Sequence, residues 1–177
     1  RVSGIKIGTA TITASSEGKS GTATVTVTAA AVASVNVTPP TASITVGQTT
    51  TLTAQPLDAN GNALTGRAVA WASSNAGVAT VSDAGVVTGV APGDATITAT
   101  SEGKSGTATV TVTPIPVASV TVDPATVSLT TGGTQQITAT PRDAQGNPLA
   151  DRAVTWESQN TAVATVSPAG LITAVAP

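Results

Sequence analysis

The stretch SEGKSGTATVTVT occurs twice in this chain, at residues 16–28 and, letter for letter, at residues 101–113. In its second half small apolar residues alternate with threonine, so that Ala108, Val110 and Val112 share one face of an extended segment. Alternation with a period of two is typical of a β-strand that buries one face. The preceding segment, DATITAT, alternates in the same way, and SEGKSG between the two predicts a tight β-hairpin.

The hairpin belongs to a longer repeat. Shifting the chain by 85 residues aligns it with itself from end to end, and Trp71 then falls on Trp156. Such internal repetition predicts a tandem array of similar domains. We expect residues 30–114 to form a complete repeat, residues 1–29 to be the last strands of an incomplete one, and residues 115–177 to be a repeat that lacks its last two strands.

The complete repeat is predicted to contain eight short strands separated by turns, a spacing typical of an all-β sandwich. The expected strands lie near residues 32–38, 42–46, 49–56, 67–73, 78–82, 85–90, 94–100 and 106–113. The turn DANGN carries Asn and Gly, which tolerate a positive φ. Abundant Thr and Val also favour strands, because branching at Cβ suits a pleated surface.

The composition excludes several classes of function. Only 9% of the residues are charged and the net charge is −2, which argues against a nucleic-acid partner. Polar residues interrupt every apolar run, so we expect no membrane insertion. The chain has no Cys and no His, which removes the usual zinc ligands and most nucleophile–base pairs. We therefore expect no enzyme activity, no cofactor and no metal site.

The two tryptophans, Trp71 and Trp156, are the only aromatic residues. An exposed Trp could stack on a sugar ring. A core made otherwise of Ala, Val, Ile and Leu needs one large side chain in its middle, however, and Trp supplies it. We therefore assign both tryptophans to the structural core.

The acidic residues give no convincing site. DANGN, which begins at Asp58, looks like half of a calcium loop, but the position where such a loop needs a glutamate holds Val69. We therefore predict a turn there. Glu102 and Lys104 at the hairpin tip are interpreted as an exposed ion pair worth less than about 1 kcal/mol.

Threonines form rows on the outward face of the last strand. The simplest explanation is that Thr is a polar residue with a high strand propensity. The alternative is that these hydroxyls carry O-linked glycans, and an N-linked site is a further option at the sequon that begins with Asn36. The candidate attachment residues are Asn36, Thr107, Thr109, Thr111 and Thr113.

The order of the segments resembles the bacterial immunoglobulin-like domain of group 2, which occurs in tandem in invasin and intimin-like adhesins, surface-layer proteins and some phage structural proteins. The matching segments are VASVNVTP and VASVTVDP, VAWASSNAGVATVS and VTWESQNTAVATVS, and GVVTGVAPGDATITATSEGKSGTATVTV. The resemblance covers essentially every residue. It implies tandem immunoglobulin-like Greek-key β-sandwiches, without a cofactor, that are used outside the cytoplasm.

Two explanations are open for the repeat that starts near residue 115 and lacks a final hairpin. Either these residues are a window from a longer tandem array, or residues 8–28 of another molecule complete the repeat by strand donation. The expected partners are neighbouring repeats of the same or an adjacent chain, and glycans.

We expect an extracellular or cell-surface module of a bacterial or phage stalk, fibre or filament. The alternative is an adhesin-type module that binds a carbohydrate or a receptor. The loops of this chain lack the Trp, Tyr and Arg clusters that dominate binding energies, which argues against this alternative.

Overall fold

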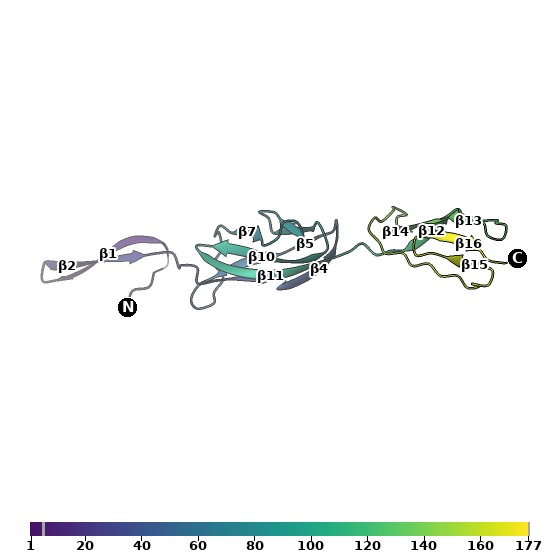
Figure 1. The fold of residues 1–177 in the computed structure, drawn as a ribbon. Coiled ribbons are helices and arrows are strands. Elements are labelled where there is room, and N and C mark those ends of the chain that lie inside the picture. The colour runs from purple at the N-terminus through teal and green to yellow at the C-terminus, as the bar shows by residue number, and fades with distance from the viewer. Residues whose placement is uncertain (5, 177) are drawn as a thin grey trace. The chain divides into compact units, whose positions relative to one another are not determined.

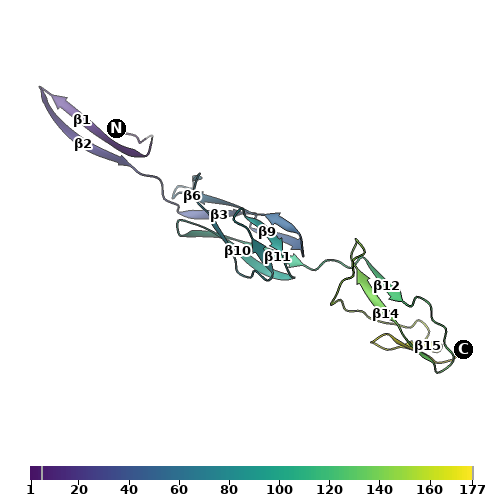
Figure 2. The ribbon, with the colours of Figure 1, turned by 90° about the horizontal axis from the view of Figure 1, so that it is seen from above.

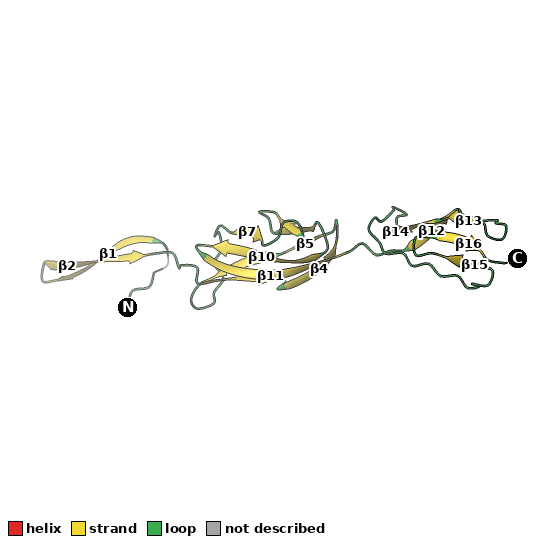
Figure 3. Cartoon of the chain, in the orientation of Figure 1, coloured by secondary structure: helices red, strands yellow, loops and turns green. Residues whose placement is uncertain are grey.

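The computed structural model describes residues 1–4 and 6–176, and every regular element in them is a β-strand (Figures 1 and 3). The prediction of an all-β protein is confirmed. No helix in this described part is long and apolar enough to cross a membrane. The chain divides into unit 1, Arg1–Pro114, and unit 2, Ile115–Pro177.

Unit 1 begins with a hairpin of two strands, β1 (Gly8–Ser16) and β2 (Lys19–Val27), that pair antiparallel along their whole length. Glu17 and Gly18 form the turn with φ values of 48° and 77°. Positive φ at both central residues matches the right-handed twist of the flanking strands. The hairpin predicted from SEGKSG is therefore confirmed.

The rest of unit 1 is a β-sandwich. One layer contains, in the order of hydrogen bonding, β4 (Thr41–Thr45), β11 (Lys104–Thr113), β10 (Gly93–Ser101) and β7 (Ala70–Ser73). The other contains β3 (Ser34–Thr38) paired with β6 (Thr53–Leu57), together with β5 (Thr49–Thr51), β9 (Val86–Gly89) and β8 (Ala79–Val81), in that order. Figure 2 shows β3 beside β6.

The hairpin β10–β11 lies in the middle of its layer and supplies half of the core. Its inward residues are small and strictly alternating, and Ile97 and Val110 are completely buried. The buried cluster consists of Val32, Val35, Val37, Leu52, Ala79, Val87, Ala95, Ile97, Ala99, Ala108, Val110 and Val112. The alternation read from the sequence therefore identifies the buried face correctly.

Two expected strands differ from the observed ones. The strand predicted over residues 49–56 is interrupted at Leu52, whose N–H donates to the carbonyl of Gly85 (2.9 Å). At this point the chain changes partner, since β5 pairs with β9 whereas β6 pairs with β3. The strand predicted from residue 67 begins only at Ala70, which lies opposite Thr100 of β10.

Unit 2 contains one layer of the same sandwich. β12 (Ser119–Asp123) pairs with β14 (Thr138–Arg142), and β13 (Thr134–Gln136), β16 (Leu171–Ala174) and β15 (Ala164–Val166) form a second sheet in that order. These strands correspond, 85 residues later, to the layer of unit 1 that contains β3, β6, β5, β9 and β8. Residues 115–176 include no counterpart of β10 and β11.

Two further segments of unit 2 do not form strands, although their sequences repeat those of β4 and β7. They are residues 126–130 and residues 155–158. In unit 1, β4 pairs only with β11 and β7 pairs only with β10, so neither counterpart has a partner. The apolar residues that β11 covers in unit 1 are exposed: Val35 is 7% exposed and its counterpart Val120 is 53% exposed.

The close approach of β11 to β3 depends on Gly106, and this gives a prediction. A Cβ atom at Gly106 would lie 2.2 Å from the backbone oxygen of Val35, whereas a Cβ at its counterpart Gly21 would meet nothing within 4 Å. We expect Gly106→Ala to destabilise unit 1 by about 1 to 3 kcal/mol, because backbone must move to relieve the overlap.

The measurement is urea unfolding at low protein concentration in a Trp156→Phe background, so that only Trp71 reports. The matched control, Gly21→Ala, should leave the transition unchanged. Equal effects of the two substitutions would contradict the argument.

Candidate binding surfaces

Asp58 and Asp143 organise equivalent turns. Oδ1 of Asp58 accepts hydrogen bonds from the N–H groups of Asn60 (2.8 Å) and Asn62 (2.9 Å), and Oδ2 accepts one from Nδ2 of Asn62 (3.0 Å). Asp143 accepts the equivalent hydrogen bonds 85 residues later, from the N–H groups of Gln145 and Asn147 and from Nδ2 of Asn147. The predicted turn is confirmed. No group of three or more His, Cys, Asp or Glu in the described residues could hold a metal ion.

These hydrogen bonds also set the acidity of the two carboxyl groups. The side-chain hydrogen bond from Asn62, with support from backbone N–H groups of the same turn, lowers the pKa of Asp58 below its ordinary value of 3.8. The side-chain hydrogen bond from Asn147 does the same for the pKa of Asp143. In both turns the donors stabilise the charged form.

A group of residues that we call the N-terminal clasp holds the start of the complete repeat against the turn of its last hairpin. Nη1 of Arg67 donates to Oε1 of Glu102 (2.9 Å), and Nη2 of Arg67 donates to the carbonyl of Ala30 (2.6 Å). The N–H of Val32 donates to Oε2 of Glu102 (3.1 Å). The clasp therefore fixes where the chain enters the sandwich.

The clasp corrects one interpretation made from the sequence. Glu102 pairs with Arg67, which lies 35 residues away, and not with its hairpin neighbour Lys104. Sequence spacing could not reveal this contact. The only available signal was the recurrence of an arginine at position 152 in the second repeat.

Trp71 and Trp156 occupy equivalent places. Trp71 is half-buried and packs against the buried cluster, and its ring lies over Gly85, where an added Cβ would be 3.0 Å from Cζ2. The ring of Trp156 lies over Gly170 in the same way, at 3.1 Å. Trp156 also borders a hollow of about 240 Å³, which is lined as well by Ile137, Ala164 and Ile172.

The outward side of the first layer of unit 1 is covered with hydroxyl groups from three strands. Thr109 of β11 lies opposite Thr96 of β10 and beside Thr41 of β4. We call this surface the hydroxyl face, and it consists of Thr41, Ser43, Thr45, Thr96, Thr98, Thr100, Thr107, Thr109, Thr111 and Thr113. It presents donors and acceptors on a stiff, almost uncharged sheet.

The structure separates the four candidate threonines of β11 into two pairs. Thr107 and Thr109 are exposed, and their hydroxyls make no hydrogen bond to the described residues. The hydroxyl of Thr111 donates to an aspartate of β10 (2.6 Å), and that of Thr113 donates to a carbonyl of β4 (3.3 Å). Asn36 is exposed on β3. Glycan attachment at these residues stays a prediction.

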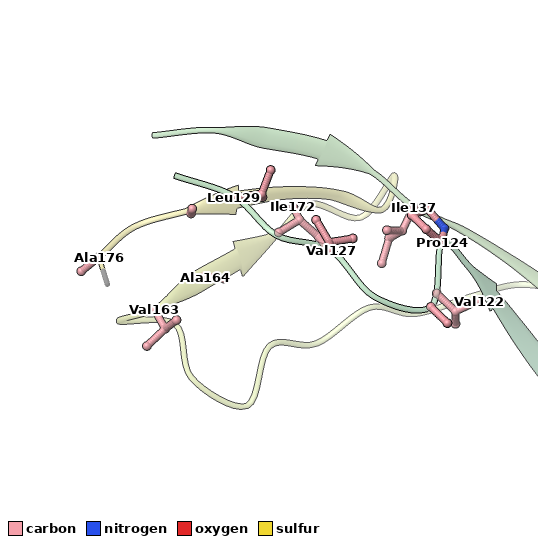
Figure 4. Close-up of a pocket in the computed structure, with 11 residues that line it drawn as sticks. Val122, Pro124, Val127, Leu129, Ile137, Val163, Ala164, Ile172 and Ala176 are labelled. Atoms are coloured by element: carbon pink, nitrogen blue, oxygen red, sulfur yellow. The ribbon is translucent and has the colours of Figure 1, made fainter. Parts of the chain in front are cut away.

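Unit 2 has an open groove of about 500 Å³ where unit 1 has its core (Figure 4). All the residues that line the groove are apolar, and five of the eleven belong to positions that are buried in the complete repeat. They are Val122, Pro124, Ala125, Val127, Leu129, Ile137, Val163, Ala164, Ile172, Ala174 and Ala176. The groove can take up apolar side chains but offers no group for acid–base chemistry.

Two β-sheets that pack over an apolar core of alternating inward residues are the architecture of an immunoglobulin-like domain. The family model described as bacterial Ig-like domain (group 2) matches residues 31–113 and residues 116–177, and the chain belongs to that family. The resemblance inferred from the sequence is confirmed, as is the immunoglobulin-like fold.

A curated bacterial protein is similar to this chain. Ice-binding protein 1 of Shewanella frigidimarina (strain NCIMB 400) is 40% identical over 173 residues, which cover 96% of this chain and 19% of that protein. The chain thus spans about a fifth of the length of this curated relative.

Solved structures are similar to it as well. The S-layer protein rSbsC is 27% identical, with 92% of this chain and 23% of that chain covered and a TM-score of 0.48. The Escherichia coli adhesin FdeC is 24% identical, with coverages of 90% and 63% and a TM-score of 0.46. Invasin, a bacterial integrin-binding protein, is 18% identical, with coverages of 97% and 40% and a TM-score of 0.44.

The two turn aspartates predict how acid acts on stability. Because the pKa of each is lower in the folded chain, their contribution is present above pH 3.8 and is lost as the pH falls toward the folded-state pKa. We expect the Asp58→Asn, Asp143→Asn double variant to lose less unfolding free energy than the parent chain between about pH 5 and about pH 2.

Urea unfolding at a series of pH values measures this difference. Asp83→Asn, at an exposed aspartate outside these turns, is the matched control and should keep the parent's pH dependence. The explanation fails if the double variant and the parent lose stability in parallel.

Proposed function

We propose that the chain is a non-catalytic structural module of a bacterial or phage extracellular stalk, fibre or filament. In this proposal tandem repeats set the distance between a surface and whatever the fibre presents. Membership of a bacterial immunoglobulin-like family and the presence of two matched stretches in one chain support it. An extracellular or cell-surface location is part of the same proposal.

The observation that carries the proposal is the placement of the two ends of the complete repeat. The N-terminal clasp holds Val32 beside Glu102, at the turn where β11 begins. The chain leaves the repeat at Thr113, the other end of the same strand. Ten residues of β-strand span about 30 Å. Each complete repeat therefore adds this length between entry and exit, as a spacer requires.

The pairing of β4 with β11 supports a load-bearing role. These two strands run parallel, from Thr41 opposite Thr109 to Thr45 opposite Thr113. Force that pulls the early part of the repeat away from its C-terminal end slides parallel strands past each other. The hydrogen bonds between the two strands then bear the force at the same time, instead of breaking one after another. One of them joins the N–H of Val46 to the carbonyl of Thr113 (3.0 Å).

The alternative of an adhesin-type binding module has less support. Carbohydrate and receptor sites rely on exposed aromatic and arginine side chains, but both tryptophans are half-buried and packed over glycines. Arg67 is engaged in the N-terminal clasp. The open groove of unit 2 is apolar throughout and corresponds to a core, which suits another part of a repeat better than a sugar.

The proposal predicts a mechanically strong repeat. In single-molecule stretching of the full chain held at its two ends, residues 31–113 should unfold in one event that adds roughly 250 Å, from about 3.4 Å per extended residue less the folded length. Unit 2, which lacks the parallel strand pair, should yield at lower force. If the complete repeat unfolds no later than unit 2, the load-bearing role is wrong.

A pair of proline variants isolates the parallel strands. Val46→Pro removes the N–H that bonds to Thr113 and should lower the unfolding force, at an equilibrium cost of about 0.5 to 1.5 kcal/mol. Its counterpart Thr131 occupies the same place in a turn closed from Gly133 N–H to the carbonyl of Thr130 (2.8 Å). Pro is favoured at that place, so Thr131→Pro is the control and should have no mechanical effect.

A further inference from the structure

The turn that follows β6 in the complete repeat contains an asparagine next to a glycine. Among the asparagines of the sequence only Asn60 has a glycine, Gly61, as the next residue. Both residues are exposed, and the carboxamide of Asn60 makes no hydrogen bond to any residue that the structure describes. Because glycine has no side chain to shield its backbone nitrogen, this nitrogen has free access to the side-chain carbon of the asparagine before it.

We propose that Asn60 is a modification site, at which the complete repeat changes irreversibly by deamidation, and that the turn organised by Asp58 controls the rate. The reaction needs no enzyme and no cofactor, and its only co-reactant is water. The inference goes beyond the spacer role, since it concerns the covalent state of the repeat and not what the repeat connects.

The reaction proceeds through a ring. The backbone nitrogen of Gly61 loses its proton to hydroxide and attacks Cγ of Asn60, so that a bond forms between them. The bond from Cγ to Nδ2 then breaks, and the nitrogen takes up a proton and leaves as ammonia. Water opens the resulting succinimide at either of its two carbonyl groups and leaves aspartate or isoaspartate. One water is consumed for each ammonia released, and nothing is oxidised or reduced.

The fold itself requires the glycine of this reactive pair. The φ angle of Gly61 is 81°, in a region that residues with a side chain rarely adopt. A Cβ at this position would meet nothing within 4 Å, so conformation and not space selects glycine. A bulkier residue that would shield the nitrogen is therefore incompatible with the turn.

Hydrogen bonds of the turn hold the attacking nitrogen back. The N–H of Gly61 donates to the carbonyl of Asp58 (3.0 Å), and the N–H of Asn60 donates to Oδ1 of Asp58 (2.8 Å). In this state the proton that the nitrogen must lose is engaged, and both peptide groups are fixed. The reaction therefore requires the turn to open, and every hydrogen bond that Asp58 accepts slows it.

The equivalent turn of unit 2 provides a comparison within the same chain. Oδ1 of Asp143 accepts the N–H of Gln145 (2.9 Å), and the carbonyl of Asp143 accepts the N–H of Gly146 (3.0 Å). At the reactive position the two turns differ in a single methylene, since Gln145 stands where unit 1 has Asn60. A glutamine would have to close a six-membered ring, which forms far more slowly than the five-membered ring of asparagine.

Both products disturb the turn. Isoaspartate adds a methylene group to the main chain, which cannot then keep the hydrogen bond from Asp58 N–H to the carbonyl of Asn62 (2.9 Å) together with the bridge between Leu57 and Ala63. Aspartate at position 60 brings a second negative charge close to the carboxylate of Asp58, and like charges repel. Conversion therefore weakens the complete repeat and leaves the turn of unit 2 intact.

The test is mass spectrometry of the full chain after incubation at neutral and mildly alkaline pH, with each change assigned to a residue by peptide mapping. We expect the exchange of a carboxamide for a carboxyl group to appear first at Asn60. The rate should rise with pH, because the attacking nitrogen must lose its proton.

Two reciprocal substitutions test the site. Asn60→Gln gives unit 1 the turn sequence of unit 2 and should abolish the conversion. Gln145→Asn gives unit 2 the turn sequence of unit 1 and should create a second site that converts at a similar rate. Since both changes place a residue in a turn that already accepts it in this chain, each is the matched control of the other.

Asp58→Ala tests the control by the turn. It should raise the rate at Asn60 roughly tenfold or more, because it removes several hydrogen bonds, among them bonds to a charged group. Asp143→Ala, the same change in the equivalent turn, should leave that rate unchanged. Fluorescence of Trp71 in a Trp156→Phe background shows whether unit 1 stays folded. Asn62→Ala, which removes only the bond to Oδ2, should raise the rate by a smaller factor.

Three results would each overturn the inference. The first is a folded chain in which Asn60 keeps its carboxamide throughout an incubation that converts a peptide of residues 57–63. The second is a Gln145→Asn variant whose new asparagine stays intact while Asn60 converts. The third is an equal rate at Asn60 in the Asp58→Ala and Asp143→Ala variants.

Discussion

The structure depends on the pairing of both edges of one hairpin. β10 and β11 bond to each other, and through their outer edges they convert residues 41–45 and residues 70–73 into strands. Without them those segments would leave unpaired backbone groups beside an apolar surface, which is costly when water is excluded. Unit 2 demonstrates the dependence, because the corresponding segments TVSLT and TWES have related sequences and form no strands. The hairpin therefore completes the hydrogen bonding of its layer and covers the apolar core.

The unusual composition follows from the same arrangement. A hairpin that alternates Ala, Ile and Val with Thr presents a flat, shallow apolar face, so the two layers can approach closely. Gly106 marks the closest point, at the carbonyl of Val35. The half-buried Trp71 then fills the wider region over Gly85. Outside, threonine keeps the strand propensity while it supplies hydroxyls, and this explains how a sheet with few charges can carry a polar outer face.

The sequence alone predicted those features that are local or periodic. The SEGK turn, the alternating strands and the turn built by Asp58 all depend on neighbours along the chain, and all are observed. The N-terminal clasp was not predicted, because Arg67 and Glu102 are distant in sequence. Nor could the pattern distinguish residues 155–158 from residues 70–73. Strand formation there is decided by a partner across the gap and not by propensity.

The last hairpin of a repeat has both local and non-local determinants. The hairpin carries its own turn, register and inward face, so its sequence specifies its shape wherever it is placed. Yet two strands alone are marginally stable in water, and its exposed Ile12 has no counter-surface within its own hairpin. In unit 2, Val120 and Val122 are exposed, and residues 126–130 and 155–158 have no strand partner among the described residues. In unit 1, Gly106 at the crossing with β3 and Glu102 at the turn are the groups that fix the depth and the register of this hairpin.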